Sequence, residues 1–289
     1  MMSVGFETAV VTGGDGRRLE VLTTAGTSAA VVVLHMGTPA GLVELPFRLV
    51  DGARARIVMY ARPGYGESTA QPGRSVADAA GDVATILDAL GVDAFVAAGW
   101  SGGGPHALAC AALLADRCEA TAIIAGIAPA LADVQDWSDS KMGLARRGDD
   151  EGLAAALEVD RAASESLQAA DIAAMFTSEP DRAALTNEYA AWVAASFGAG
   201  YAAGVAGARD DWMAFVRDWG FKLADARRVT LWQGDCDDMV TPANAQWLAD
   251  RIPGSVLQML PGEGHMSIGL RLPEILDDLL SRGRAETGP

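Results

Sequence analysis

The sequence predicts an α/β fold with a mostly parallel, doubly wound sheet, and two observations support this prediction. Short apolar runs typical of buried strands alternate with amphipathic or Ala-rich stretches typical of helices over most of the chain. One apolar run, 94–98, leads through Gly99-Trp-Ser-Gly-Gly103 directly into an Ala/Leu-rich helix. Strands separated by helices pair in parallel, so we expect an open sheet with helices on both faces.

The elements of the N-terminal half follow from their periodicity and from their turn residues. Two extended segments joined by Gly13-Gly14-Asp15-Gly16 indicate a hairpin, and continuous apolar runs indicate strands buried on both faces. Apolar residues at helical spacing indicate a helix at 75–90, with Ser75 as N-cap and Gly91 as its end. We expect strands at Glu7–Thr12, Arg17–Thr24, 29–34, 55–60, 94–98 and 120–127, and helices at 42–53, 75–90 and 102–116.

The pattern changes between residues 130 and 220, where no strand-like run occurs. Ala-rich helical stretches with scattered Trp, Phe and Met predict a helical insertion that forms a lid over one edge of the sheet. The two parts that flank it, 1–129 and 221–289, then form one core domain. Helices are expected in the insertion at Gly152–Ala163, Ser166–Met175 and Asp181–Phe197, and after it a strand at 229–233, a helix at 243–251, a strand at 255–260 and a helix at 272–281.

Composition excludes several classes of partner. The chain has 289 residues, half of them hydrophobic, and a net charge of −16, which disfavours nucleic acid and anionic membrane surfaces. Cys110, Cys118 and Cys236 show no metal-binding spacing. The first residues do not show a basic region followed by an apolar one, and no apolar stretch is long enough to span a bilayer, so we expect a cytoplasmic protein with reduced thiols.

Ser101 stands at the tip of the turn between the strand at 94–98 and its helix. A Gly-x-Ser-x-Gly turn in this setting is typical of a nucleophile elbow, where side chains at Gly99 and Gly103 would collide. The N-terminus of the following helix directs its amides and positive dipole end towards an oxyanion formed at the serine. The alternative is a Gly-rich turn that serves packing alone.

A serine hydroxyl needs a base, and the base needs a carboxylate partner. The chain supplies Ser101, then Asp235, Asp237 and Asp238 after one predicted strand, and then His265 after the next. All lie in loops at the carboxyl ends of predicted parallel strands, which share one edge of the sheet. The spacing from Gly234 favours Asp237 as the partner of His265, whereas Asp235 and Asp238 are expected to cap the next turn. The alternative for His265 is a surface histidine.

The turn His35-Met-Gly-Thr-Pro39 also follows a predicted strand and can direct a backbone amide outwards. We expect the amides of Thr38 and Gly102 to form an oxyanion hole. Trp100 and His35 are candidate substrate contacts, although a structural role for His35, bracing its loop, is favoured. His106, in the first turns of the helix after Ser101, is expected to pack beneath the turn.

The motifs together resemble those of the α/β-hydrolase superfamily over nearly the whole chain. The resemblance implies an eight-stranded sheet with a helical cap after the sixth strand, Ser101 as nucleophile, His265 as base, Asp237 as acid, and the Thr38 and Gly102 amides as oxyanion donors. Two positions depart from the usual pattern, since Met36 separates His35 from Gly37 and Ala61 replaces a common Asp. The motifs are His35-Met-Gly-Thr-Pro39, Arg62-Pro-Gly-Tyr-Gly-Glu-Ser68, Gly99-Trp-Ser-Gly-Gly103, Gly234-Asp-Cys-Asp237 and Gly262-Glu-Gly-His265.

The function expected from these residues is hydrolysis of a small carboxylic ester or related acyl compound through an acyl-enzyme. It requires no metal or cofactor, and a homo-oligomer is possible. Two alternatives use the same residues: a different reaction (perhydrolysis, carbon–carbon bond hydrolysis, a lyase or an aminopeptidase reaction), or ligand binding without turnover.

Overall fold

The computed structural model describes residues 5–26, 28, 30–50 and 54–284. Its centre is one eight-stranded sheet in the order β1-β2-β4-β3-β5-β6-β7-β8. β2 pairs antiparallel with β1 and β4, and the pairs from β4 to β8 are all parallel. The predicted eight-stranded, mostly parallel fold is therefore confirmed. The strands are β1 (Phe6–Thr12), β2 (Arg18–Thr24), β3 (Val31–His35), β4 (Arg56–Tyr60), β5 (Phe95–Trp100), β6 (Cys118–Ile124), β7 (Val229–Gly234) and β8 (Val256–Leu260).

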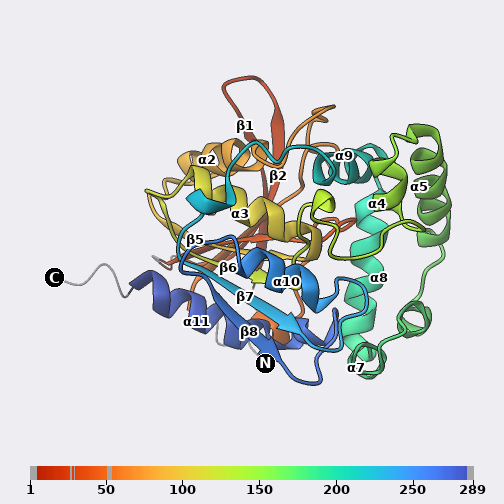
Figure 1. The fold of residues 1–289 in the computed structure, drawn as a ribbon. Coiled ribbons are helices and arrows are strands. Elements are labelled where there is room, and N and C mark those ends of the chain that lie inside the picture. Colours follow the sequence, from red (N-terminus) through yellow and green to blue (C-terminus); the bar gives the residue numbers. More distant parts are fainter. Residues whose placement is uncertain (1–4, 27, 29, 51–53, 285–289) are drawn as a thin grey trace.

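Helices cover both faces of this sheet (Figure 1). Residues of α2 (Asp78–Leu90), α3 (Gly104–Leu113) and α10 (Pro242–Ala249) pack on one face with Val33, Phe95 and Leu231. Residues of α1 (Phe47–Val50) and α11 (Leu272–Arg284) pack on the other face with Val32 and Ala98. All five residues of β3 and all six of β5 are buried, as expected for strands between two helical layers.

The helices predicted at 42–53 and from Ser75 need correction at their N-terminal ends. The helix predicted at 42–53 is the single turn α1, because Pro46 restricts the residue before it and cannot donate a helical hydrogen bond; positions 51–53 lie outside the described residues. The helix predicted from Ser75 begins at Asp78, and Ser75 donates through its amide and its hydroxyl to the Asp78 carboxylate. Its predicted end is confirmed, since Gly91 has a φ of 64°.

The segment between β6 and β7 contains helices and no strand within its described residues. Figure 1 shows these helices gathered at one side of the sheet. The helix predicted at Asp181–Phe197 is two helices that separate at Leu185 and Thr186, and the one predicted at Ser166–Met175 begins later, at Ala169. We call α4–α9 the inserted helices; they are α4 (Lys141–Arg146), α5 (Asp150–Ser164), α6 (Ala169–Ile172), α7 (Glu179–Ala184), α8 (Asn187–Tyr201) and α9 (Ala206–Phe215).

Two further features concern the length of the helices and the state of the cysteines. Among the described residues, no helix combines the length and the apolar character that crossing a membrane requires. The three cysteines are free thiols: Cys110 and Cys118 are buried, and Cys236 is exposed.

Candidate active site

Ser101 lies where β5 ends and a short 3₁₀ turn, Ser101–Gly103, leads into α3. Its φ is +54°, a region that L-residues rarely occupy and that costs about 1–3 kcal/mol. The turn is possible because the neighbouring residues Gly99 and Gly103 carry no side chains. A Cβ on Gly99 would lie 2.4 Å from the carbonyl oxygen of Gly103, and one on Gly103 would lie 2.1 Å from that of His35. The structure therefore has the sharp strand–turn–helix geometry expected from the sequence.

Gly103→Ala is expected to destabilise the fold, because the atoms that the added Cβ would meet, in the carbonyl groups of His35 and Met36, belong to backbone that cannot yield cheaply. We expect a loss of about 1–3 kcal/mol or more in the free energy of unfolding, measured by urea denaturation. The matched control is Gly81→Ala in α2, where an added Cβ meets nothing within 4 Å. Alanine there is expected to stabilise the fold by about 0.5–1 kcal/mol. Equal stability of the two variants would contradict this account of the turn.

The structure brings His265 and Asp237 together at the ends of β8 and β7. His265 Nδ1 lies 2.9 Å from Asp237 Oδ2, and both side chains are buried. The other carboxylate oxygen, Oδ1, accepts hydrogen bonds from the amides of Met239 and Val240 at 3.0 and 2.8 Å. Gln233 donates to Oδ2 at 3.1 Å, so the carboxylate is fixed on both sides. This network orients the histidine ring through its Nδ1 atom.

The two other carboxylates considered as partners of His265, those of Asp235 and Asp238, form hydrogen bonds with different groups. Asp235 accepts a hydrogen bond from the amide of Gly262 at 2.7 Å, and Asp238 accepts one from the Thr177 hydroxyl. Neither follows the expectation that it caps the next turn. A Cβ on Gly234 would lie 2.1 Å from the Glu263 carbonyl oxygen, so Gly234 lets the two loops approach closely enough for Asp237 to meet His265.

The charges around His265 favour its protonated form. Burial alone would lower the pKa of His265, but the nearby carboxylates of Asp237, Asp181 and Asp238 outweigh burial and raise the pKa above its ordinary value. The imidazolium that forms when a histidine accepts a proton is therefore stabilised here.

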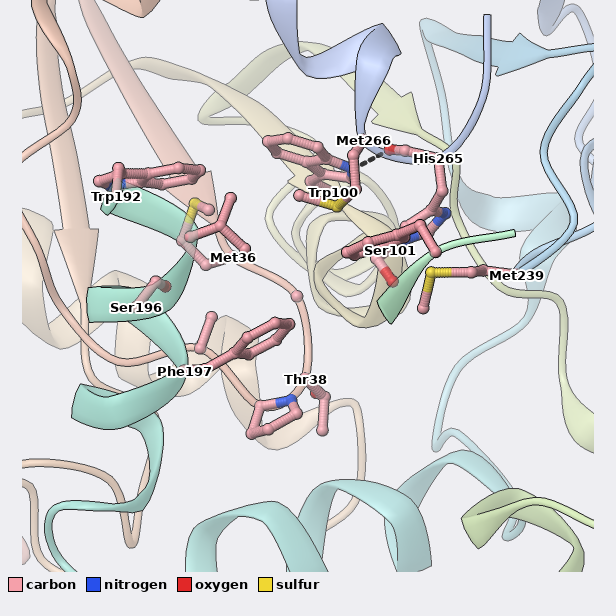
Figure 2. Close-up of a pocket in the computed structure, with 15 residues that line it drawn as sticks. Met36, Thr38, Trp100, Ser101, Trp192, Ser196, Phe197, Met239, His265 and Met266 are labelled. Carbon is pink, nitrogen blue, oxygen red and sulfur yellow. Dashed lines mark hydrogen bonds between the residues drawn. The ribbon is translucent and has the colours of Figure 1, made fainter. Parts of the chain in front are cut away.

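A cavity of about 80 Å³ opens beside Ser101 and His265, and its lining is mostly apolar. Figure 2 shows Trp192, Ser196 and Phe197, all from α8, across the cavity from Ser101, His265 and Met239. Within the described part of the chain no hydrogen bond joins Ser101 to His265; both side chains line the same cavity. The lining residues are Met36, Gly37, Thr38, Pro39, Ala40, Trp100, Ser101, Phe176, Trp192, Val193, Ser196, Phe197, Met239, His265 and Met266.

The loop after β3 crosses directly over Ser101. A Cβ on Gly37 would lie 3.3 Å from that of Ser101, and one on Gly102 would lie 2.7 Å from Thr38 Oγ1. Thr38 and Gly102 are thus neighbours beside the serine, as the sequence predicts. Thr38 lines the cavity, and its amide has no hydrogen-bond acceptor among the described residues.

The remaining predicted site residues have different positions. Trp100 lines the cavity, and its indole Nε1 donates to the carbonyl oxygen of His265 at 3.2 Å. His35 is not part of the cavity lining; it is buried with its Nε2 atom 3.7 Å from Cys110 Sγ, in agreement with the structural role. Burial and the charge of Arg62 lower the pKa of His35 to about 3, so its ring is neutral. His106 packs beneath the turn, with Nδ1 2.9 Å from the Gly102 carbonyl oxygen.

Four buried charged residues around the cavity were not predicted as site residues. Arg62 and Arg74 follow β4, whereas Asp181 and Asp211 come from the inserted helices α7 and α9. Arg62 belongs to a recognised motif, but nothing in the sequence distinguishes the two aspartates from the many surface carboxylates of an acidic chain. No group of three or more His, Cys, Asp or Glu side chains is placed to hold a metal ion in the described ranges.

Comparison with known families agrees with this geometry. The sequence model described as the alpha/beta hydrolase fold matches residues 30–271. The chain belongs to the alpha/beta hydrolase fold family. No curated protein sequence gives a significant match.

Solved structures with the same fold include an alpha/beta hydrolase fold protein from Chitinophaga pinensis, at 15% identity with a TM-score of 0.70, covering 99% of each chain. The esterase RhEst1 from Rhodococcus sp. ECU1013 is 21% identical with a TM-score of 0.67, covering 97% of this chain and 99% of its own. A thermophilic esterase from Thermogutta terrifontis is 18% identical with a TM-score of 0.67, covering 96% and 98%. At identities this low, the structural similarity establishes a shared fold alone.

Proposed function

We propose that this alpha/beta hydrolase fold protein is a serine hydrolase that cleaves carboxylic esters with a small, apolar acyl group. The observation that carries the proposal is the contact of His265 Nδ1 with Asp237 at 2.9 Å, together with the strained Ser101 in the same cavity. Asp237 holds the Nδ1 side of the ring, which leaves Nε2 to act on the serine hydroxyl. Esterases among the structures of the same fold are consistent with this chemistry.

The proposed reaction proceeds in two halves. Ser101 Oγ attacks the ester carbonyl carbon while His265 takes the hydroxyl proton, and the amides of Thr38 and Gly102 receive the oxyanion. His265 then gives its proton to the departing alkoxide, which leaves as an alcohol, and Ser101 remains acylated. A water molecule transfers a proton to His265 and attacks the acyl carbon. Release of the carboxylic acid returns the proton to Ser101.

The substrate class is argued from the lining. The cavity is small, and its walls are mainly Met, Phe, Trp and Ala side chains with few polar groups, which favours a short or compact apolar acyl chain. In this proposal the inserted helices act as a cap, because Phe176 and four residues of α8 (Trp192, Val193, Ser196 and Phe197) supply one wall of the cavity. Cap and core then correspond to the segments 130–220 and to 1–129 with 221–289.

The test is labelling of the wild-type protein with a fluorophosphonate, followed by intact-mass measurement, and a panel of p-nitrophenyl esters of increasing acyl length. We expect a single phosphonyl adduct and turnover that is greatest for short acyl chains. An unlabelled protein would overturn the proposal in favour of ligand binding without turnover. A labelled protein with negligible ester turnover would favour another reaction of the same residues, such as perhydrolysis or carbon–carbon bond cleavage.

A further inference from the structure

Two buried aspartates of the inserted helices contact the loops of the core that carry the proposed catalytic groups. Asp211, on α9, reaches the loop of residues 36–38, and Asp181, on α7, reaches the loop at His265. Both side chains are fully buried. A carboxylate removed from water is costly unless it is fully paired, so each one is held by a specific set of partners.

Asp211 is the centre of a charged cluster. Its Oδ2 atom accepts hydrogen bonds from Thr38 Oγ1 and Tyr65 Oη, both at 2.7 Å, and from Arg62 Nη2 at 2.6 Å. Its Oδ1 atom accepts one from Arg74 Nη2 at 2.6 Å. Burial alone would raise the pKa of Asp211, but the two guanidinium groups outweigh burial and hold it well below its usual range. Asp211 is therefore ionised.

Arg62 connects Asp211 to the loop of residues 36–38 through hydrogen bonds. Its Nη1 atom donates to the Met36 carbonyl at 2.7 Å, and its Nη2 atom donates to the Gly37 carbonyl and to Thr38 Oγ1, both at 3.0 Å. One planar guanidinium group thus contacts three consecutive residues, among them the proposed oxyanion donor. A guanidinium has this geometry because its donors lie in a fixed fork, which an ammonium group lacks.

The charge balance makes this arrangement depend on Asp211. Arg62 and Arg74 both approach the same carboxylate. Burial and the charge of Arg62 both act to lower the pKa of Arg74, but the charge of Asp211 outweighs them and raises that pKa above its ordinary value. His35 and His106 beside them are neutral, because burial lowers the pKa of both. Without the charge of Asp211, two buried guanidinium groups would repel each other, and Arg62 would move relative to the loop that it holds.

Asp181 holds the backbone at His265 in a similar manner. Its Oδ2 atom accepts a hydrogen bond from the amide of His265 at 3.0 Å, and its Oδ1 atom accepts from the amides of Met266 and Ser267, both at 2.8 Å. A Cβ on Gly264 would lie 2.4 Å from Asp181 Oδ1, so this approach requires glycine at that position. Three consecutive amides are thereby fixed by one side chain from outside the core.

We propose that Asp211 and Asp181 are positioning residues of the active site: Asp211, through Arg62, holds the loop of residues 36–38 in its oxyanion-binding geometry, and Asp181 holds His265 in place next to Ser101. The inference rests on the proposed function and goes beyond it, because it assigns to the inserted helices the assembly of the catalytic groups as well as a wall of the cavity.

The first test is Asp211→Asn, which keeps the size of the side chain and removes its charge. We expect kcat for the preferred p-nitrophenyl ester to fall about 10²–10³-fold, the loss that follows removal of one oxyanion donor. KM is expected to stay within a few-fold, and the midpoint of the acid limb of kcat/KM to stay unchanged, because the contact of His265 with Asp237 is intact. If Asp211→Asn does not fold, Arg62→Lys tests the same step, since lysine keeps a cation for Asp211 but cannot reach both carbonyls.

The second test is Asp181→Asn, which places an amide NH₂ against one of the three backbone amides. We expect kcat to fall about 10²-fold through displacement of His265. The carboxylates that face His265 are Asp237 and Asp238 after β7 and Asp181 from α7, while Glu263 on its own loop pairs with Arg271 at 3.4 Å. Removal of the Asp181 charge is expected to lower the pKa of His265, which moves the acid limb of kcat/KM to lower pH. Gly264→Ala, which displaces Asp181, is the second variant for this step.

The matched controls are Asp210→Asn and Asp171→Asn. Asp210 neighbours Asp211 on α9 and pairs with Arg209, and Asp171 on α6 accepts a hydrogen bond from the amide of Gln168. Both interactions stay within the insertion. We expect both controls to keep kcat and the pH profile of the wild type, even where the thermal midpoint falls.

The outcomes separate this inference from the proposed function. A wild type that is neither labelled by fluorophosphonate nor active on esters would overturn both. The second outcome is an active wild type with Asp211→Asn and Asp181→Asn variants that keep its kcat and pH profile and lose only thermal stability. In that case the two aspartates have a purely structural role. That result would overturn the inference and leave the proposed function intact.

Discussion

Replacing Ser101 by alanine is expected to remove ester hydrolysis and phosphonylation together. Ser101 supplies the nucleophile that forms the acyl-enzyme in the proposed mechanism, so the rate should fall by about 10⁶-fold, towards the residual level that binding and oxyanion contacts provide. The measurements are turnover of the preferred p-nitrophenyl ester and the intact mass after fluorophosphonate treatment. The fold should persist, because alanine keeps the Cβ at a position that already accepts a positive φ.

Ser196→Ala is the matched control for that variant. Ser196 lines the same cavity, from α8, but it lies on the wall opposite Ser101 (Figure 2). We expect it to retain labelling and turnover within a few-fold of the wild type. A covalent adduct that persists in Ser101→Ala, or that disappears in Ser196→Ala, would show that the nucleophile has been assigned to the wrong residue.

Asp237→Asn is expected to produce the second largest effect. The amide cannot stabilise the imidazolium and can hold the ring in the wrong tautomer, which for such a triad costs about 10⁴-fold in kcat. The pH profile should change as well. His265 must be neutral to accept a proton, so activity falls as pH drops through its pKa, which Asp237 helps to raise. Without that carboxylate the pKa falls, and the acid limb of kcat/KM moves to lower pH.

Asp235→Asn serves as the control for the acid position. Asp235 is two residues away and accepts its hydrogen bond from Gly262, which an amide oxygen can still do. We expect the activity and pH profile of the wild type. If Asp235→Asn lost as much activity as Asp237→Asn, the contact between His265 and Asp237 would not be the one that supports catalysis.

Sequence reasoning predicted positions correctly where the position of a residue depends on its own neighbours in the chain. The turn at Ser101 depends on Gly99 and Gly103, each within a few positions, and the choice of Asp237 depends on its spacing from Gly234. The buried strands were recognisable because continuous apolar runs have few other uses in a chain of this length. Most predicted elements therefore differ from the observed ones only at their ends.

Sequence reasoning could not find contacts that depend on how the inserted helices lie on the core. Asp211 is 149 positions from Arg62, and Asp181 is 84 positions from His265. Asp181 shares α7 with the exposed Glu179, and Asp211 directly follows a second aspartate, Asp210, on α9. Nothing in the local sequence indicates which of these carboxylates is buried against the core. The error at 42–53 has another origin: the apolar periodicity continues across Pro46, and the backbone restriction at proline overrides it.

The contact between α9 and the loop after β4 bears on exchange of the insertion between family members. A Cβ on Gly64 would lie 2.9 Å from the Cα atom of Gly207, and one on Gly207 would lie 2.6 Å from the Tyr65 ring. Gly264 and Asp181 fit each other just as closely at the other end of the insertion. A foreign insertion grafted here would meet a core shaped for a glycine at position 207 and for the carboxylate of Asp181. The insertion and its receiving loops therefore form a matched set, and a functional chimera would have to transfer them together.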